Sequence, residues 1–211
     1  TALSPQPFLF TETSSYDGHN NPTSMTDALG GTAKYTYTAF DEVENITDAL
    51  GNQSVARRDD RGLVTAVTDP RGKTTTMDYD RAGNMVAQTT PLGEKTTFAY
   101  DSAGRLISST DPLGNTTRFT YDDADRLVKV QEPDKARPAE TVYDAAGEVA
   151  KTIDTLGRDT SYQYDKVINR LLSTTDPNGG TTSTTYTPGG REASATDAEG
   201  NRTTNTYDAR G

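Results

Sequence analysis

A 21-residue repeat, written out twice without a gap between Tyr79 and Tyr121, constrains this chain more than any other feature. The two copies carry the same residue types at matching places: Tyr79, Asp80, Gly83, Pro91, Gly93 and Phe98 in the first copy, and Tyr100, Asp101, Gly104, Pro112, Gly114 and Phe119 in the second. A fixed period of this size indicates a repeat architecture, in which one small supersecondary unit is stacked on copies of itself. Any function therefore belongs to the array rather than to one unit.

Each unit contains two short strand patterns separated by two tight turns. Residues 105–110 and 116–121 are rich in Thr and in β-branched or aromatic side chains, which favour strands. Between them, Asp111, Pro112 and Gly114 supply a side-chain acceptor, a preset φ and a residue suited to positive φ. Residues 100–104 have the same turn chemistry. We therefore predict an all-β protein, a repetitive antiparallel β-meander with strands near residues 84–90, 95–100, 105–110 and 116–121.

The period extends along nearly the whole chain. Nine units and the opening of a tenth fill residues 16–211, and residues 1–15 read as a lead-in segment or a degenerate repeat. The units begin at Tyr16, Tyr37, Arg58, Tyr79, Tyr100, Tyr121, Tyr143, Tyr164, Tyr186 and Tyr207. The units that begin at Tyr121 and Tyr164 are one residue longer, and in them residues 131–138 and 167–169 replace regular turn sequences. We expect loops at those two places.

The tyrosines are expected to form the main apolar spine of the sheet. Side chains two residues apart on a strand share one face, so each Tyr lies beside the residue two positions before it, and neighbouring units can pack these groups together. The same signature continues beyond the central units at Tyr143, Asp144, Gly147, Gly157 and Tyr164.

Composition alone gives a conflicting answer. Leu, Ile, Val and Phe supply 31 of 211 residues and the net charge is -10, values typical of disordered chains. The apolar residues, however, occupy fixed places in a repeat, which predicts order without a thick globular core. Eighteen strands about 4.8 Å apart would form a ribbon on the order of 85 Å long that has to coil, and we expect an open wall that by itself encloses nothing.

Several classes of function lose support from the residue types. The chain has no cysteine, which removes disulfides and thiolate metal sites, and no apolar run approaches the length of a membrane span or a signal peptide. Its acidic balance argues against nucleic acid. The recurring aspartates are interpreted as turn formers rather than as catalytic or calcium-binding groups, and the single histidine, His19, as an exposed loop residue. We predict no catalytic residues, no metal and no cofactor.

The run Tyr100-Asp101-Ser102-Ala103-Gly104-Arg105-Leu106, followed by Asp111-Pro112-Leu113-Gly114-Asn115, closely resembles the RHS or YD repeat family. This family includes bacterial Rhs and insecticidal toxin-complex proteins and the animal teneurins. The resemblance implies a β-sheet strip that winds into a hollow shell, which in the bacterial toxins encloses a C-terminal toxic domain until delivery. Arg58 in place of Tyr, Asp125 in place of Gly, and Thr187 in place of Asp depart from the pattern.

The leading hypothesis is a non-catalytic segment of such a shell in a secreted, cell-surface or delivered protein. Its partners would be the remainder of the parent shell and an enclosed toxin domain. The alternative hypothesis is an adhesion array that binds a surface glycan or a protein receptor. An enzyme is the third possibility, and it lacks any unique cluster of reactive groups.

Overall fold

The computed structural model describes residues 12–208, and this part of the chain contains nineteen strands and no helix. The chain divides into two compact units. One reaches to Arg105 and includes Asp111–Leu113, and the other consists of Leu106–Thr110 and the residues from Gly114 onward. The first unit therefore holds strands β1 to β9 and the second holds β10 to β19.

The strands of the first unit are β1 (Thr13–Tyr16), β2 (Pro22–Thr26), β3 (Thr32–Tyr37), β4 (Val43–Thr47), β5 (Gln53–Arg58), β6 (Val64–Thr68), β7 (Thr74–Tyr79), β8 (Met85–Thr89) and β9 (Lys95–Tyr100). Those of the second unit are β10 (Leu106–Thr110), β11 (Thr116–Tyr121), β12 (Leu127–Gln131), β13 (Ala139–Tyr143), β14 (Val149–Ile153), β15 (Asp159–Tyr164), β16 (Leu171–Thr175), β17 (Thr181–Tyr186), β18 (Glu192–Thr196) and β19 (Arg202–Thr204). The all-β prediction is confirmed, and β8 to β11 begin and end within one residue of the predicted strands.

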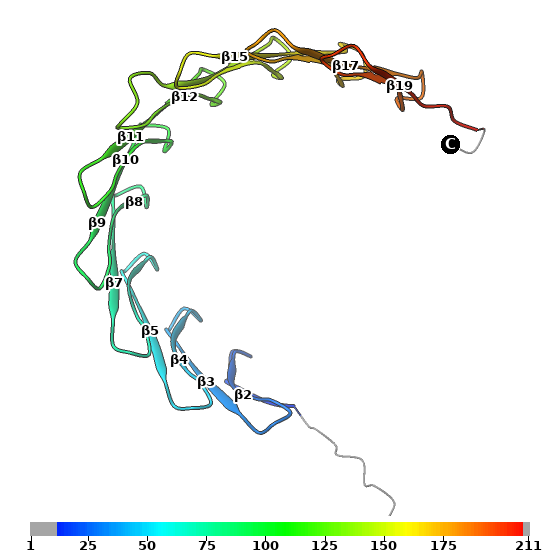
Figure 1. Ribbon diagram of the computed structural model, residues 1–211. Coiled ribbons are helices and arrows are strands. Elements are labelled where there is room, and N and C mark those ends of the chain that lie inside the picture. The colour runs from blue at the N-terminus through cyan, green and yellow to red at the C-terminus, as the bar shows by residue number, and fades with distance from the viewer. Residues whose placement is uncertain (1–11, 209–211) are drawn as a thin grey trace, which may run out of the picture. The chain divides into compact units, whose positions relative to one another are not determined.

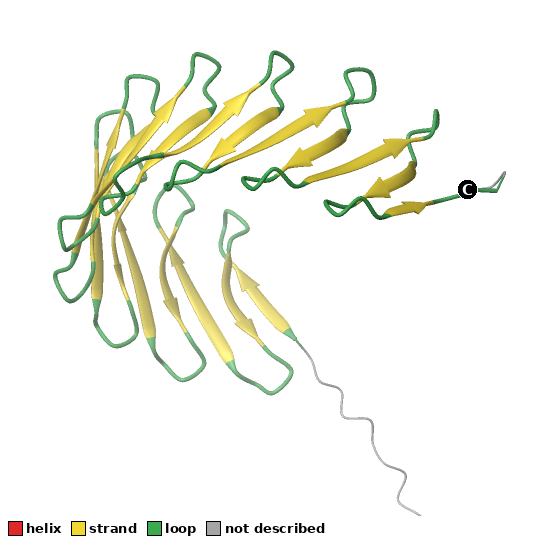
Figure 2. Ribbon diagram, turned by 45° about the horizontal axis from the view of Figure 1, so that its top comes forward, coloured by secondary structure: helices red, strands yellow, loops and turns green. Residues whose placement is uncertain are grey.

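Each of the two compact units is an antiparallel meander, in which every strand pairs with the next strand along the chain (Figure 1). The meander follows directly from the sequence, because three-residue loops leave no room for a crossover connection. Turns of two kinds alternate along it and lie at opposite ends of the strands (Figure 2). We call them the Tyr-Asp turns, which follow the repeated Tyr, and the Asp-Pro turns, which lie half a repeat later.

Both kinds of turn have the same backbone geometry. In the Tyr-Asp turn of residues 80–84, Asp80 N–H donates to the Asn84 carbonyl over 2.9 Å and Gly83 N–H donates to the Asp80 carbonyl over 3.2 Å. The Asp-Pro turn of residues 90–94 repeats both bonds at 2.9 Å. This is a three-residue hairpin loop whose last loop residue is left-handed, with φ of 90° at Gly83 and 83° at Gly93. The predicted positive φ of the glycines is confirmed.

Where glycine is missing from this place, a residue that tolerates the left-handed region replaces it. Asn20, Asp41 and Asp125 have φ of 68°, 60° and 62°. These are the residue types that adopt left-handed φ most readily after glycine. The two irregular units form longer loops, as expected: residues 132–138 replace one Asp-Pro turn, and Asn169 N–H donates to the Asp165 carbonyl over 2.9 Å in a Tyr-Asp turn enlarged by one residue.

The two kinds of hairpin differ in their register. Tyr-Asp hairpins carry a bulge beside the repeated Tyr, or beside Arg58 where it replaces Tyr: Tyr79 pairs with Met85 and Asp78 pairs with Ala87, so Val86 is an extra residue in β8. The Asp-Pro hairpins pair without a shift, as Thr68 with Thr74 shows. Because a bulge increases local twist and re-aims side chains, it sets the direction of the tyrosine at every repeat.

Almost nothing in the described residues is fully buried. Only Ala87 and Ser194 fall in the buried class, with exposed fractions of 4% and 3%. Most strand side chains are half-buried. The prediction of order without a thick globular core is confirmed, and the sheet is held mainly by its ladders, its turns and side-chain hydrogen bonds between hairpins.

Candidate functional site: the tyrosines and their turns

The repeated aspartate completes its own turn. Asp101 Oδ1 accepts N–H groups of Ala103 and Arg105 over 2.9 and 3.0 Å, and Arg105 Nε donates to Asp101 Oδ2 over 2.7 Å. These bonds, first from the backbone and then from the side chain of Arg105, lower the pKa of Asp101. The bond to the residue two positions on was expected from Asp chemistry and is present. Each such carboxylate thus serves its own turn.

Sequence reasoning missed the second half of this arrangement, the donor four residues after the aspartate. That place carries Arg or Asn in many turns, and its side chain donates to the second carboxylate oxygen. The bonds run from Asn21 to Asp17, Asn52 to Asp48, Asn84 to Asp80, Arg126 to Asp122, Arg158 to Asp154 and Asn201 to Asp197. The recurrence of Arg and Asn after the glycine was the available signal.

The tyrosine hydroxyls join most hairpins to the one before. Tyr100 donates to the carbonyl of Met85 over 3.0 Å, and Met85 lies opposite Tyr79 in the preceding hairpin. The bond recurs from Tyr37 to Pro22, Tyr79 to Val64, Tyr121 to Leu106, Tyr143 to Leu127, Tyr186 to Leu171 and Tyr207 to Glu192. The apolar-spine prediction omitted this bond, although the use of Tyr rather than Phe at each repeat indicated it.

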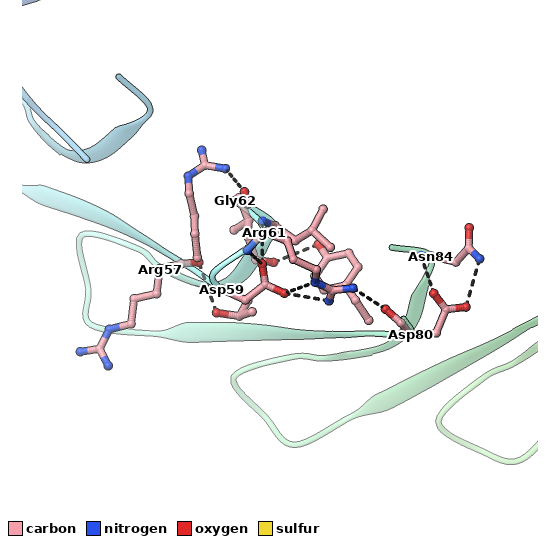
Figure 3. A network of polar contacts seen from close by, with 11 residues as sticks. Arg57, Asp59, Arg61, Gly62, Asp80 and Asn84 are labelled. Atoms are coloured by element: carbon pink, nitrogen blue, oxygen red, sulfur yellow. Dashed lines mark hydrogen bonds and ion pairs between the residues drawn. The ribbon is translucent and has the colours of Figure 1, made fainter. Parts of the chain in front are cut away.

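At the departure from the pattern, Arg58 contacts the preceding hairpin through an ion pair instead of a hydroxyl bond. Its Nε lies 3.3 Å from Glu42 Oε2 without hydrogen-bond geometry, and its Nη1 donates to the Gly62 carbonyl of its own turn over 2.9 Å. In the same region Arg61 bonds Asp59 Oδ2 through Nε and Nη2 and reaches the Asp80 carbonyl through Nη1 at 2.6 Å (Figure 3). Arg61 thereby links two successive Tyr-Asp turns.

Arginines also cover several of the tyrosine rings. The guanidinium carbon of Arg126 lies 4.3 Å from the centre of the Tyr143 ring. Arg170 and Arg191 cover Tyr186 and Tyr207 at 5.4 and 5.3 Å. Each of these arginines ends the Tyr-Asp turn of the preceding hairpin, so a cation–π contact reinforces the hydroxyl bond between hairpins.

His19 lies exposed in the first Tyr-Asp turn, as the sequence indicated. Its Nδ1 is 2.7 Å from Asp41 Oδ1 in the next Tyr-Asp turn. This hydrogen bond and the charge of Asp41 raise the pKa of His19 above its ordinary value. Asn21 donates to the same Asp41 oxygen over 2.7 Å, so the pair is one more link between successive turns.

In residues 12–208, no group of three or more His, Asp or Glu side chains is placed to hold a metal ion. The same residues contain no helix long and apolar enough to cross a membrane.

The tips of the Asp-Pro turns present large apolar side chains to solvent. The residue two positions after the turn's first residue is leucine in many turns, with exposed fractions from 71% to 89%: Leu29, Leu50, Leu92, Leu113 and Leu156. The corresponding place in several Tyr-Asp turns is alanine, at Ala82, Ala103, Ala124 and Ala146. The leucines recur at the period of the repeat, and each is largely exposed.

The sequence and the fold both match known proteins. A family model described as RHS Repeat matches residues 16–53, 58–95, 100–137 and 168–203, together more than half of the chain. The crystal structure of TcdB2-TccC3-Cdc42 has a TM-score of 0.67 to this chain at 16% identity, covering 88% of this chain and 11% of that chain. For the crystal structure of TcdB2-TccC3 the values are 0.66, 15%, 88% and 12%. Among curated proteins, none matches the sequence.

Identities this low establish likeness of fold alone. The chain spans about a tenth of the length of the chains in these two structures. Each segment matched by the family model spans close to two of the 21-residue units, so one family repeat corresponds to two Tyr-Asp hairpins with an Asp-Pro turn between them.

Proposed function

Because the chain belongs to the RHS repeat family, we propose that it is a non-catalytic segment of a shell wall. In a longer protein this wall encloses a C-terminal toxin domain for secretion or delivery. The observation that carries the proposal is the fold match to TcdB2-TccC3-Cdc42, in which a stretch that matches 88% of this chain makes up 11% of a far longer chain. The partners are the remaining repeats of the shell and the enclosed domain.

The energetics of the sheet support a wall. A single 21-residue repeat with scarcely any buried side chain cannot be stable alone, and its stability comes from bonds to the repeats on either side. The tyrosine hydroxyls and the arginines over the rings supply such bonds at nearly every repeat. The carboxylates, which an enzyme would need for chemistry, are engaged by the N–H groups of their own turns.

The leucines of the Asp-Pro turns add a second line of support. A row of exposed leucines is costly on a surface that stays in water and is typical of a surface that another layer covers. In a shell, the covering layer is the edge of a neighbouring stretch of the same strip, whose turns repeat with the same period. The small alanines at the tips of the Tyr-Asp turns leave room for such side chains.

Protease protection tests the proposal. A catalytically inactive C-terminal domain is fused to the complete repeat array of the parent protein and, separately, to residues 12–208. Trypsin should spare the domain in the first fusion and digest it in the second, because one wall segment does not seal a cavity. Digestion at equal rates in both fusions would contradict encapsulation and favour a surface-binding role.

A further inference from the structure

From Tyr37 onward, Tyr164 differs from the other repeated tyrosines. Its hydroxyl makes no hydrogen bond to any described residue, whereas Tyr143 and Tyr186 on either side donate to carbonyls of the preceding hairpin over 3.3 and 2.8 Å. Nor does any arginine of the described residues cover its ring, although Arg126 covers Tyr143 and Arg170 covers Tyr186. Both links to the preceding hairpin are therefore missing at Tyr164.

The cause lies at the residue that ends the preceding Tyr-Asp turn. That place is Arg before Tyr143, Tyr186 and Tyr207, and before Tyr164 it is Glu148. From Tyr37 onward, the other repeated tyrosines follow Asn, Leu or Arg at this place, so Glu148 is the single acid. One other described Tyr-Asp turn, residues 38–42, also ends in an acid. This acid, Glu42, pairs with the guanidinium of Arg58. Glu148 forms no ion pair within residues 12–208 and instead accepts a bond from Asn169 Nδ2 at 2.6 Å.

A cavity of about 590 Å³ opens at this place, between the Tyr-Asp turns of residues 144–148 and 165–170. Tyr162 and Tyr164 line it, together with Asp144, Asp165 and small side chains such as Ala146. Partial burial, and next the charge of Glu148, raise the pKa of the Tyr164 hydroxyl. The cavity thus combines aromatic surface with a negative field.

We propose that this cavity binds the guanidinium group of an arginine side chain presented by another polypeptide. The ring of Tyr164 would receive the cation as the rings of Tyr143, Tyr186 and Tyr207 receive theirs, at 4.3 to 5.4 Å within this protein. Asp144 and Asp165 also line the cavity, and because N–H groups of their own turns bond to Oδ1 of each, the second oxygen, Oδ2, is the acceptor that each can offer a guanidinium. Charge favours the same occupant, since the chain carries a net charge of -10.

Of the described residues that line the cavity, Lys166 is the one cation. It belongs to the enlarged Tyr-Asp turn, its side chain makes no ion pair with a described residue, and it is exposed. An ammonium is a compact, strongly hydrated charge without the planar fork of arginine, so it competes with a guanidinium only weakly. Substituting Lys166→Met should therefore leave arginine binding intact or strengthen it.

The direct test uses the peptide acetyl-Gly-Arg-Gly-amide and the neutral, nearly isosteric peptide with citrulline in place of arginine. The ring resonances of Tyr162 and Tyr164 are followed by NMR in the complete chain. We expect saturable shifts with the arginine peptide in the millimolar range and binding at least about tenfold weaker with the citrulline peptide. Equal binding of the two peptides, or no saturable shift at Tyr164, would overturn the proposal.

Exchanging the charges at the equivalent positions 148 and 126 of two hairpins gives a matched control. Glu148→Arg supplies the internal guanidinium found before Tyr143 and should abolish peptide binding, whereas Arg126→Glu removes that group and should create a second site at Tyr143. Glu148→Gln, which keeps the size of the side chain, should weaken binding without disturbing the amide spectrum. If Glu148→Arg and Glu148→Gln both fold and bind the peptide as the unaltered chain does, the assignment of the site is wrong.

Discussion

The Tyr-Asp turns form one edge of the meander and the Asp-Pro turns form the other, and the two edges use the same turn geometry for different purposes. Tyr-Asp and Asp-Pro turns share the three-residue loop, the left-handed third residue and the aspartate that accepts two N–H groups. Among the described strand pairs, a bulge is present at Tyr-Asp hairpins and absent from the Asp-Pro hairpins, and it is beside the bulge that Tyr hydroxyls, guanidinium groups and the His19–Asp41 pair reach from one hairpin to the next. The Tyr-Asp edge thus adds side-chain links to the backbone ladders of the strip.

The Asp-Pro edge lacks the bulge and presents leucines to solvent instead. Its hairpins are closed by local means, such as the hydroxyl pair of Thr68 and Thr74 at 2.8 Å, which joins two strands of one hairpin. The comparison teaches that a repeat can separate its two tasks. The backbone ladders join the strands along the whole strip, most of the side-chain hydrogen bonds between successive hairpins lie at the Tyr-Asp edge, and the Asp-Pro edge presents leucines that remain available for contacts outside the strip.

The largest effect is expected from acid, because it acts on turns of both edges at once. Bonds from the side chain and backbone N–H of Asn52 lower the pKa of Asp48, and bonds from the backbone and side chain of Arg105 lower that of Asp101. A carboxyl whose pKa is lowered in the folded state stabilises the fold fully above the unfolded pKa of about 3.9. This stabilisation is lost as the pH falls through the lower folded pKa.

Thr187 provides the matched control for acid, since its hydroxyl accepts Arg191 N–H at 3.2 Å and its turn contains no carboxyl group. Amide exchange measured from pH 5 to pH 2.5 should show protection lost at the turns of Asp48 and Asp101 before the turn of Thr187. Uniform loss at the three turns would contradict the role assigned to the carboxylates.

Valine in place of the turn glycine should have the next largest effect, and an equal one at both edges. Gly83 and Gly93 have φ of 90° and 83°, and an added Cβ meets only Leu63 Cδ1 at 3.8 Å in the first case and nothing within 4 Å in the second. Backbone strain alone then sets the cost, roughly 1–3 kcal/mol for valine. Asparagine should cost clearly less, because Asn20 already occupies this conformation. Urea unfolding of the four variants measures the difference, and equal midpoints for valine and asparagine would argue against strain.

Removing a tyrosine hydroxyl should weaken the Tyr-Asp edge by a smaller amount. Tyr100→Phe removes the bond to Met85 and should lower the free energy of unfolding by about 1 kcal/mol. Tyr164→Phe is the matched control and should change stability little, because that hydroxyl has no partner among the described residues. The two variants are compared by urea unfolding, and identical losses would mean that the hydroxyl bond does not join the hairpins.

These contrasts also show how far the sequence alone could go. The 21-residue period, the Asp and Gly at each turn and the alternating strand patterns were enough to predict strand bounds, positive φ and the near absence of a core. The links between hairpins were not predicted, since they depend on where a bulge aims Tyr100 and on which side chain ends the preceding turn. Glu148 looks unremarkable in the sequence, and its effect on Tyr164 emerges only when equivalent hairpins are compared in space.

The smallest effect is expected at the Asp-Pro edge of the isolated chain. The Leu92 side chain is 82% exposed, so Leu92→Ser removes little buried surface and should change the free energy of unfolding by less than about 0.5 kcal/mol. A loss comparable to that of Tyr100→Phe would show that the leucines stabilise the strip itself, contrary to the division between the edges.

The central claim is that the leucines of the Asp-Pro edge are covered in a larger wall. The most direct test compares the solvent accessibility of one leucine position in the present chain and in a complete repeat array. The chain contains no cysteine, so Leu92→Cys introduces a single thiol whose reaction with a maleimide reports exposure at one turn tip. The same substitution is made in the complete repeat array of the parent protein, with any native cysteines removed. We predict rapid labelling in the present chain and labelling at least about tenfold slower in the complete array, where a neighbouring stretch of strip covers the turn. Equal labelling rates in the two proteins would contradict the account.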